Sequence, residues 1–196
     1  LEGSVFMGGA IIKWLRDNLG IINSAQEIEL LARQVDSNEG VYIIPAFTGL
    51  GAPYWNSHIT ASINGLTRGS NKSHIARAAL EAIAYQVTDL VHAMQEDIGH
   101  DLSDLKVDGG AANCLLLLQI QANCLLIPIQ HPHNTESTAL GAAIIAGIGN
   151  NIYQRIEQLQ PLFKVKFTVE PDTTNSQVSL YKSWQKAIQT HLINIE

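Results

Sequence analysis

The sequence is poor in cysteine and in charge, and it has no long uninterrupted apolar run. Only Cys114 and Cys124 occur among 196 residues, which argues against a disulfide scaffold and fits a reducing compartment such as the cytoplasm. Charged residues make up 15%, the formal net charge is −6, and lysines and arginines do not cluster, so we expect no nucleic-acid or membrane-surface partner. The longest apolar stretch, 111–129, is interrupted by Asn, Gln and Pro, and no membrane span is expected.

Apolar residues make up 46%, and a chain of 196 residues can bury a sizeable core, so the sequence predicts a globular domain. We expect a regular core over about 1–150 and a less regular tail over 151–196 that ends in a helix. The chain starts at Leu1 and enters a helical pattern almost at once, and we therefore expect it to be part of a longer protein.

Short β-branched runs alternate with amphipathic segments, which predicts an α/β fold with helices packed against a sheet. The long helix is expected to begin at Asn71 or Ser73 and to end at Gly99. The other expected helices cover 4–19, 25–35, 112–123, 138–148 and 178–192, and the expected strands cover 41–44, 61–67, 105–107 and 125–130.

Two glycine pairs are candidates for a ligand site. Gly109 and Gly110 lie between an expected strand and an expected helix, where free backbone amides could face a phosphate or a sugar. On shape alone, a tight turn without a ligand is the favoured explanation of this pair. Gly8 and Gly9 fall inside the expected first helix, with Lys13 on the same face as Gly9, so a flat ring could lie on bare backbone. Close packing between helices is the alternative for this pair.

Other conspicuous residues predict structure rather than chemistry. His131 and His133 flank a proline without further metal ligands nearby, which favours an exposed turn. Cys114 and Cys124 are ten residues apart on one expected helix and therefore cannot form a disulfide. The scattered carboxylates include no candidate general base, and we expect neither a catalytic residue nor a metal ligand in this chain.

Several blocks together, in this order, resemble the carboxyl-terminal domain of the FGGY family of carbohydrate kinases, and of its glycerol kinase branch in particular. The resemblance covers essentially the whole chain. Its blocks are LEGSVF at 1–6, WLRD at 14–17, VYIIPAFTGLGAPYW at 41–55, the paired segments 61–66 and 74–81, VDGGA at 107–111 and TALGAA at 138–143.

The resemblance implies a ribonuclease H-like (actin-like ATPase) domain with a mixed sheet, the second of two domains that clasp ATP. It implies that Gly9 and Lys13 lie at the nucleotide and that Gly110 meets its phosphate–ribose part. Lys13 stands where the family usually has glutamine, and Cys114 where it has an adenine-side asparagine. Asn113 lies one residue earlier and could replace that asparagine only if the helix start shifts.

The resemblance also implies the function, an ATP-dependent glycerol kinase that forms sn-glycerol 3-phosphate and ADP. In the family an aspartate base, the glycerol site and most contacts to Mg²⁺ belong to the amino-terminal FGGY domain, which this chain lacks. We therefore expect this fragment to be inactive alone, and the complete enzyme to be cytoplasmic and homo-oligomeric. The alternatives are an FGGY kinase for another polyol or a ketopentose, and a non-catalytic nucleotide-binding relative.

Overall fold

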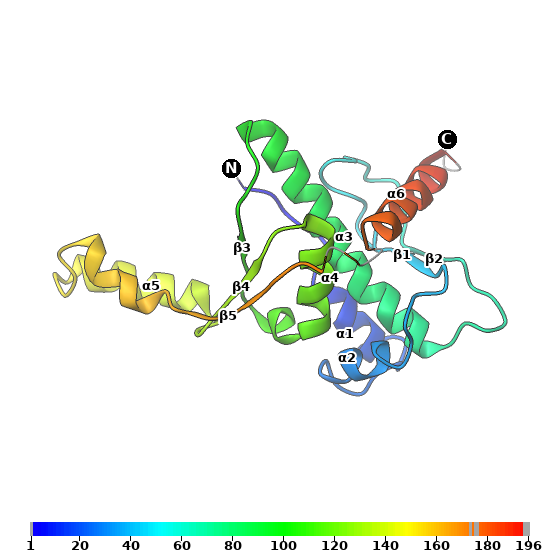
Figure 1. Ribbon diagram of the computed structural model, residues 1–196, viewed down its shortest axis with the longest axis horizontal. Coiled ribbons are helices and arrows are strands. Elements are labelled where there is room, and N and C mark those ends of the chain that lie inside the picture. The colour runs from blue at the N-terminus through cyan, green and yellow to red at the C-terminus, as the bar shows by residue number, and fades with distance from the viewer. Residues whose placement is uncertain (1, 173, 175–176, 194–196) are drawn as a thin grey trace.

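The computed structural model describes residues 2–172, 174 and 177–193, and Figure 1 shows helices gathered around a long central helix, with one helical arm outside this body. The helices are α1 (Ala10–Asp17), α2 (Glu27–Ala32), α3 (Lys72–Ile98), α4 (Leu115–Leu125), α5 (Ser137–Gly149) and α6 (Gln177–Ile193), with 3₁₀ helices η1 (Gly110–Asn113) and η2 (Ile156–Leu162). The strands are β1 (Tyr42–Ile44), β2 (Ser62–Asn64), β3 (Leu105–Lys106), β4 (Ile129–Pro132) and β5 (Val165–Val169).

The strands form two small sheets. β1 pairs antiparallel with β2. β4 pairs parallel with β3 on one side and antiparallel with β5 on the other, so the three-stranded sheet is mixed. α4 packs against β4 and β5, with Leu118 and Ala122 in contact with Ile129. The predicted α/β fold with a mixed sheet and packed helices is confirmed.

The central helix α3 begins and ends where its sequence predicts. The side chain of Asn71 accepts a hydrogen bond from the backbone N–H of Ser73 at 2.8 Å, and the backbone N–H of Asn71 donates to Nδ1 of His74 at 3.2 Å. At the other end Gly99 adopts φ +76°, a left-handed conformation that favours glycine. Between these ends α3 packs against α2, α4 and β1, and thus positions most of the other elements.

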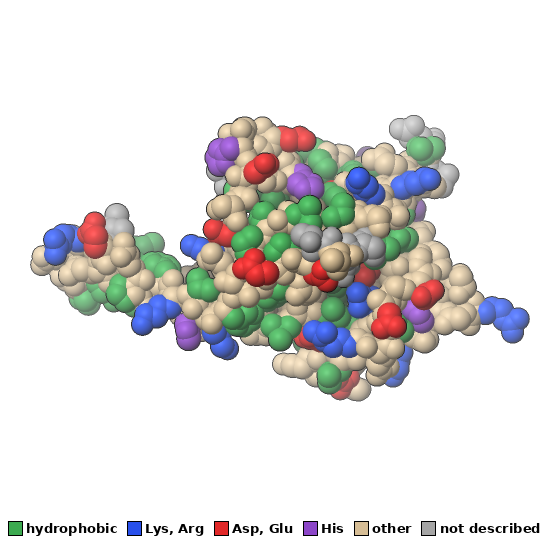
Figure 2. Space-filling view, viewed as in Figure 1, with side chains coloured by type: hydrophobic (Ala, Val, Ile, Leu, Met, Phe, Trp, Pro, Cys, Tyr) green, Lys and Arg blue, Asp and Glu red, His purple; other side chains and the backbone are tan. Residues whose placement is uncertain are grey.

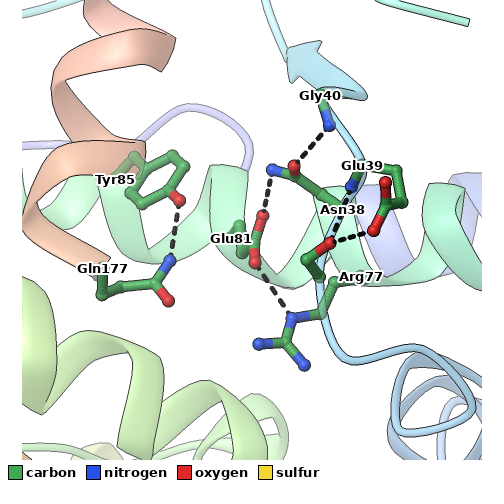
Figure 3. A network of polar contacts seen from close by, with 8 residues as sticks. Asn38, Glu39, Gly40, Arg77, Glu81, Tyr85 and Gln177 are labelled. Carbon is green, nitrogen blue, oxygen red and sulfur yellow. Dashed lines mark hydrogen bonds and ion pairs between the residues drawn. The ribbon is translucent and has the colours of Figure 1, made fainter. Parts of the chain in front are cut away.

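A buried carboxylate ties α3 to the turn before β1. Glu81 is 1% exposed and accepts hydrogen bonds from Nδ2 of Asn38 at 2.7 Å and from Nε of Arg77 at 2.9 Å (Figure 3). Burial raises the pKa of Glu81, while the hydrogen bond and charge of Arg77 act in the opposite direction. One turn further along α3, the hydroxyl of Tyr85 accepts a hydrogen bond from Nε2 of Gln177 at 2.7 Å.

The last helix, α6, is anchored to the main core. Trp184 is fully buried and its indole N–H donates to the carbonyl oxygen of Ile43 at 2.8 Å. A second anchor is Asp89 of α3, which accepts hydrogen bonds from the Tyr181 hydroxyl and from Nε2 of Gln185 at 2.9 Å. The helix predicted at 178–192 is therefore confirmed, and it packs on α3 and β1 rather than lying free.

Asp89→Asn is expected to change how stability depends on pH. Burial raises the pKa of Asp89, against the hydrogen bonds that it accepts from Tyr181 and Tyr54. The folded protein therefore binds this proton more tightly than the unfolded chain, and the resulting stability is lost as pH rises through the raised pKa. From about pH 4 to about pH 7, the free energy of unfolding of wild type should fall relative to Asp89→Asn in urea titrations. A rise instead would contradict the assignment.

Two sequence expectations near the amino terminus are wrong. The first helix begins at Ala10 instead of Ser4, because residues 2–6 run along α3, where a Cβ on Gly3 would lie 2.4 Å from Cδ1 of Leu90. The Gly8–Gly9 pair is therefore not inside the helix. Gly9 is its N-cap, a position at which the low helix propensity of glycine costs little.

The region around β4 also differs from expectation. Leu125 ends α4, and the strand expected at 125–130 begins at Ile129. His131 is not in an exposed turn: it lies in β4, is 3% exposed and stacks on Phe167 with ring centroids 4.6 Å apart. The cause is β5, a strand that the sequence analysis missed, which pairs with β4 and covers this face. His133, two residues on, is exposed as expected.

The arm outside the body consists of α5 and η2 (Figures 1 and 2). Apolar side chains on it remain exposed, among them Ile145 at 72% and Ile152 at 68%. The helix predicted at 138–148 is confirmed, but it does not pack tightly on a sheet. Over the described residues, no helix combines the length and apolar character that crossing a bilayer requires.

Candidate functional site

A cavity of about 640 Å³ opens between α1, α2 and the junction of η1 with α4. This volume is typical of small-molecule sites, which span about 300–1,000 Å³. It is lined by the five residues that the family resemblance connects with the nucleotide, Gly9, Lys13, Gly110, Asn113 and Cys114, although they come from two segments about a hundred residues apart. Gly8 and Gly109 do not line it. The lining comprises Gly9, Ala10, Ile12, Lys13, Arg16, Ala25, Gln26, Ile28, Glu29, Gly110, Ala111, Asn113 and Cys114.

The α1 wall presents bare backbone at Gly9 and a cation one turn later at Lys13. An added Cβ at Gly9 would meet only the Cβ of Ala111, at 3.8 Å, which is an ordinary van der Waals contact. Close packing between helices, the alternative explanation for this glycine, therefore does not require it. Without a side chain, position 9 leaves the cavity wall flat.

At the opposite wall, Gly109 and Gly110 have different roles. Gly109 has φ +80° and donates its N–H to the carbonyl of Thr135 at 3.0 Å, so the turn itself requires this glycine. Gly110 has no such conformation, and an added Cβ there would meet no atom within 4 Å. Gly110 therefore borders open space in the cavity, and its missing side chain serves neither turn nor packing.

The predicted helix over 112–123 is wrong at its start. Residues 110–113 form η1, Cys114 is extended at φ −84° and ψ 101°, and α4 begins only at Leu115. The rotation of about 100° expected between helical neighbours does not apply across this break. As a result Asn113 and Cys114 both line the cavity, and Nδ2 of Asn113 donates to the carbonyl of Gly110 at 3.4 Å.

The thiol of Cys114 is protonated at neutral pH. Burial raises the pKa of Cys114 to about 12, and the nearby carboxylate of Glu29 acts in the same direction. Cys124 also has a pKa raised to about 12 by burial, and both cysteines are free. Cys114 therefore offers the cavity a neutral, weakly polar group in the place where the family resemblance implies an amide.

Sequence reasoning missed Glu29, which projects from α2 into the cavity lining. Its carboxylate accepts hydrogen bonds from the backbone N–H groups of Leu115 at 3.0 Å and Leu116 at 3.1 Å. Arg33 contacts the same carboxylate at 2.6 Å. The two partners in α4 lie 86 and 87 residues along the chain, so no local pattern could have revealed these contacts.

Chemically, the site combines two walls of open backbone, two cations at Lys13 and Arg16, and apolar surface at Ile12 and Ile28. Flat, apolar surface suits a planar ring, while cations and free backbone amides suit an anionic tail. An arrangement of this kind can hold a nucleotide-like molecule. Over the described part of the chain, no group of three or more His, Cys, Asp or Glu side chains could bind a metal ion.

Comparisons with known proteins point to one family. The profile of the FGGY family of carbohydrate kinases, C-terminal domain, matches residues 1–149. The chain is 50% identical over 193 residues to a glycerol kinase of Dechloromonas aromatica, covering 98% of this chain and 38% of that protein. It is 49% identical over 189 residues to a glycerol kinase of Deinococcus radiodurans, with 96% and 38% covered. The chain thus spans well under half the length of these relatives.

Solved structures show the same relation. Plasmodium falciparum glycerol kinase, crystallised with ADP, matches with a TM-score of 0.86 and 30% identity over 97% of this chain and 38% of that one. A ligand-bound xylulose kinase from Lactobacillus acidophilus matches with a TM-score of 0.75 and 21% identity over 95% and 38%, and shows the fold alone. The fold is that of the ribonuclease H-like, actin-like ATPase domain, as expected.

Proposed function

Because this chain belongs to the FGGY family of carbohydrate kinases, as their carboxyl-terminal domain, we propose that it is the nucleotide-binding half of an ATP-dependent glycerol kinase. The proposed reaction converts ATP and glycerol into ADP and sn-glycerol 3-phosphate. The observation that carries the proposal is that Gly9 and Gly110 line the same cavity, although neither turn geometry nor packing explains why these positions are glycine. Both relatives described above are glycerol kinases, which supports the choice of glycerol.

In the proposed complex, the bare backbone at Gly9 and Gly110 lies against the nucleotide. Lys13 supplies a cation that can only donate hydrogen bonds, while Asn113 and Cys114 offer an amide and a neutral thiol on the adenine side. These residues bind and orient ATP and, with the upstream domain closed over them, exclude water that would otherwise hydrolyse it. No residue of this chain is assigned to catalysis.

We assign the remaining machinery to the upstream domain. An aspartate there is proposed to deprotonate the glycerol hydroxyl, which attacks the γ-phosphate in line. Among the described residues no group of three or more His, Cys, Asp or Glu side chains could hold a metal ion. We propose that the contacts to Mg²⁺ belong mainly to that domain. The free thiols fit the reducing cytoplasm as the location, and the complete protein is proposed to form homo-oligomers.

The test is a coupled ADP-release assay on the complete polypeptide that carries residues 1–196. Glycerol, dihydroxyacetone, ribitol and xylulose are offered in turn, each against a blank without substrate. Turnover that depends on glycerol supports the proposal. Turnover with only another substrate would leave an FGGY kinase for a different polyol or ketopentose. If the folded protein releases no ADP above the blank with any substrate, a non-catalytic nucleotide-binding relative would be favoured.

Restoring the usual family residues, with Lys13→Gln and Cys114→Asn combined, is expected to change ADP affinity by less than about tenfold. Each new amide can add a neutral hydrogen bond of about 0.5–1.5 kcal/mol net, while Lys13→Gln removes a positive charge that favours the anionic ligand, so the two effects oppose each other. The backbone at Gly9 and Gly110 is unaffected by these changes. Isothermal titration calorimetry of both proteins provides the comparison. Much tighter ADP binding by the double variant would mean that the native site is degraded. The non-catalytic alternative would then be favoured.

A further inference from the structure

One side chain bridges two walls of the cavity, the wall formed by α2 and the wall formed by η1 and the start of α4. Glu29 belongs to α2, and its carboxylate accepts hydrogen bonds from the backbone N–H groups of Leu115 at 3.0 Å and Leu116 at 3.1 Å, at the start of α4. Both α2 and the residues just before α4 line the cavity. In the described structure, therefore, these hydrogen bonds join one wall directly to the other.

Glu29 supplies the side-chain acceptor that the N-cap residue of α4 does not supply. The first N–H groups of any helix lack partners within the helix, and a side-chain oxygen at the N-cap usually accepts one of them. The N-cap here is Cys114, whose side chain forms no capping hydrogen bond. Glu29, which lies in α2, accepts hydrogen bonds from two of these N–H groups of α4. Its negative charge also suits the positive end of the α4 dipole. Arg33 holds the same carboxylate through Nε at 2.9 Å and Nη2 at 2.6 Å.

Fixing the start of α4 also fixes η1. The backbone N–H of Cys114 donates to the carbonyl of Ala111 at 3.1 Å, and that of Ala112 donates to Gly109 at 3.2 Å. The segment from Gly110 to Leu116 is thus one short, hydrogen-bonded unit. When Glu29 holds its last two amides, the positions of Gly110 and Asn113 relative to α2 are set.

We propose that Glu29 is a positioning residue for the nucleotide pocket, which sets the separation of its two walls and thereby the affinity for ADP and ATP. This inference rests on the proposed function. Glu29 acts through the backbone of α4 and takes no part in phosphoryl transfer. A pocket whose second wall is held in place only part of the time binds more weakly, in proportion to the fraction that is competent.

The chain supplies a matched control on the same short helix. Glu27 also accepts backbone and side-chain hydrogen bonds, but from Asn23 at 2.8 Å and 3.1 Å, within its own turn. It does not line the cavity, and these hydrogen bonds connect it to Asn23 rather than to α4. Glu27→Gln therefore makes the same chemical change as Glu29→Gln without touching the link between the walls.

The experiment uses the complete polypeptide and compares wild type with Glu29→Ala, Glu29→Gln and Glu27→Gln. Glu29→Ala is expected to raise the Kd for ADP and the KM for ATP by about 5- to 30-fold, the range that loss of a helix cap and its charge implies. The KM for glycerol should change by less than about twofold, because acceptor binding does not involve this wall. Glu29→Gln keeps one acceptor oxygen and should be intermediate, and Glu27→Gln should resemble wild type.

Hydrogen exchange provides a readout of the link itself. The amides of Leu115 and Leu116 should exchange faster in Glu29→Ala than in wild type or Glu27→Gln. If Glu29→Ala melts earlier but its folded fraction binds ADP as tightly as wild type, Glu29 serves only stability and the proposal is overturned. If Glu29→Ala does not fold, equal ADP affinity of Glu29→Gln and wild type overturns it. Wild type that binds no ADP would instead refute the proposed function.

Discussion

Residues 1–196, purified alone, are expected to release no ADP with glycerol above a blank without glycerol. The chain matches only 38% of the length of the glycerol kinase of D. aromatica. Phosphoryl transfer requires an oriented acceptor and charge stabilisation around the γ-phosphate, and we have assigned both to the upstream domain. Enzymes accelerate such reactions by at least about 10⁶-fold, so losing this machinery should reduce turnover to background.

The complete polypeptide at the same concentration is the positive control for that assay. Circular dichroism of the purified fragment would establish that its helices are formed when activity is measured. Steady glycerol-dependent ADP release by a fragment free of the complete protein would show that the acceptor site and the base lie within these residues. The division of labour proposed above would then be wrong.

Gly110→Val is expected to weaken nucleotide binding by about 10- to 100-fold while leaving the fold intact, because forcing extra methyl groups into a filled site costs about 1–3 kcal/mol. An added Cβ at position 110 meets no atom of the chain within 4 Å, so the fold has room for it. The side chain must therefore occupy the cavity, where it excludes a ligand that lies against the backbone. The Kd for ADP of the complete polypeptide, measured by calorimetry, checks this expectation.

Gly8→Val is the control for this substitution. An added Cβ at Gly8 also meets no atom within 4 Å, but Gly8 does not line the cavity. It should bind ADP with nearly wild-type affinity and melt at a similar temperature to Gly110→Val. If Gly110→Val also binds ADP like wild type, the nucleotide does not approach this wall, and the assignment of the cavity fails.

Local sequence was sufficient where the deciding interactions are local. Helix α3 begins at the Asn71 cap and ends at the left-handed Gly99, as predicted, since both residues act within one turn of a helix end. The final helix followed from its apolar periodicity, and the α/β class from the alternation of strands and helices. The two glycine segments were also recognised as candidate ligand contacts before the structure placed them on one cavity.

Local sequence failed where a distant segment decides. β5 was missed, and with it the burial of His131, because strand pairing depends on a partner more than thirty residues away. The start of the first helix was placed too early, since residues near Gly3 pack on Leu90 of α3. The helix expected from Ala112 begins at Leu115, where its amides meet Glu29 instead of a local cap.

The sequence by itself thus determined the fold class, the family and five of the residues that line the cavity. Only the tertiary structure decided that Asn113 and Cys114 both reach it, that Gly9 and Gly110 are free of packing demands, and that Glu29 joins the walls. The physical reason is the distance along the chain over which each kind of interaction acts. Helix propensity, caps and turns act over a few residues, whereas the cavity is held by hydrogen bonds and packing between segments more than eighty residues apart.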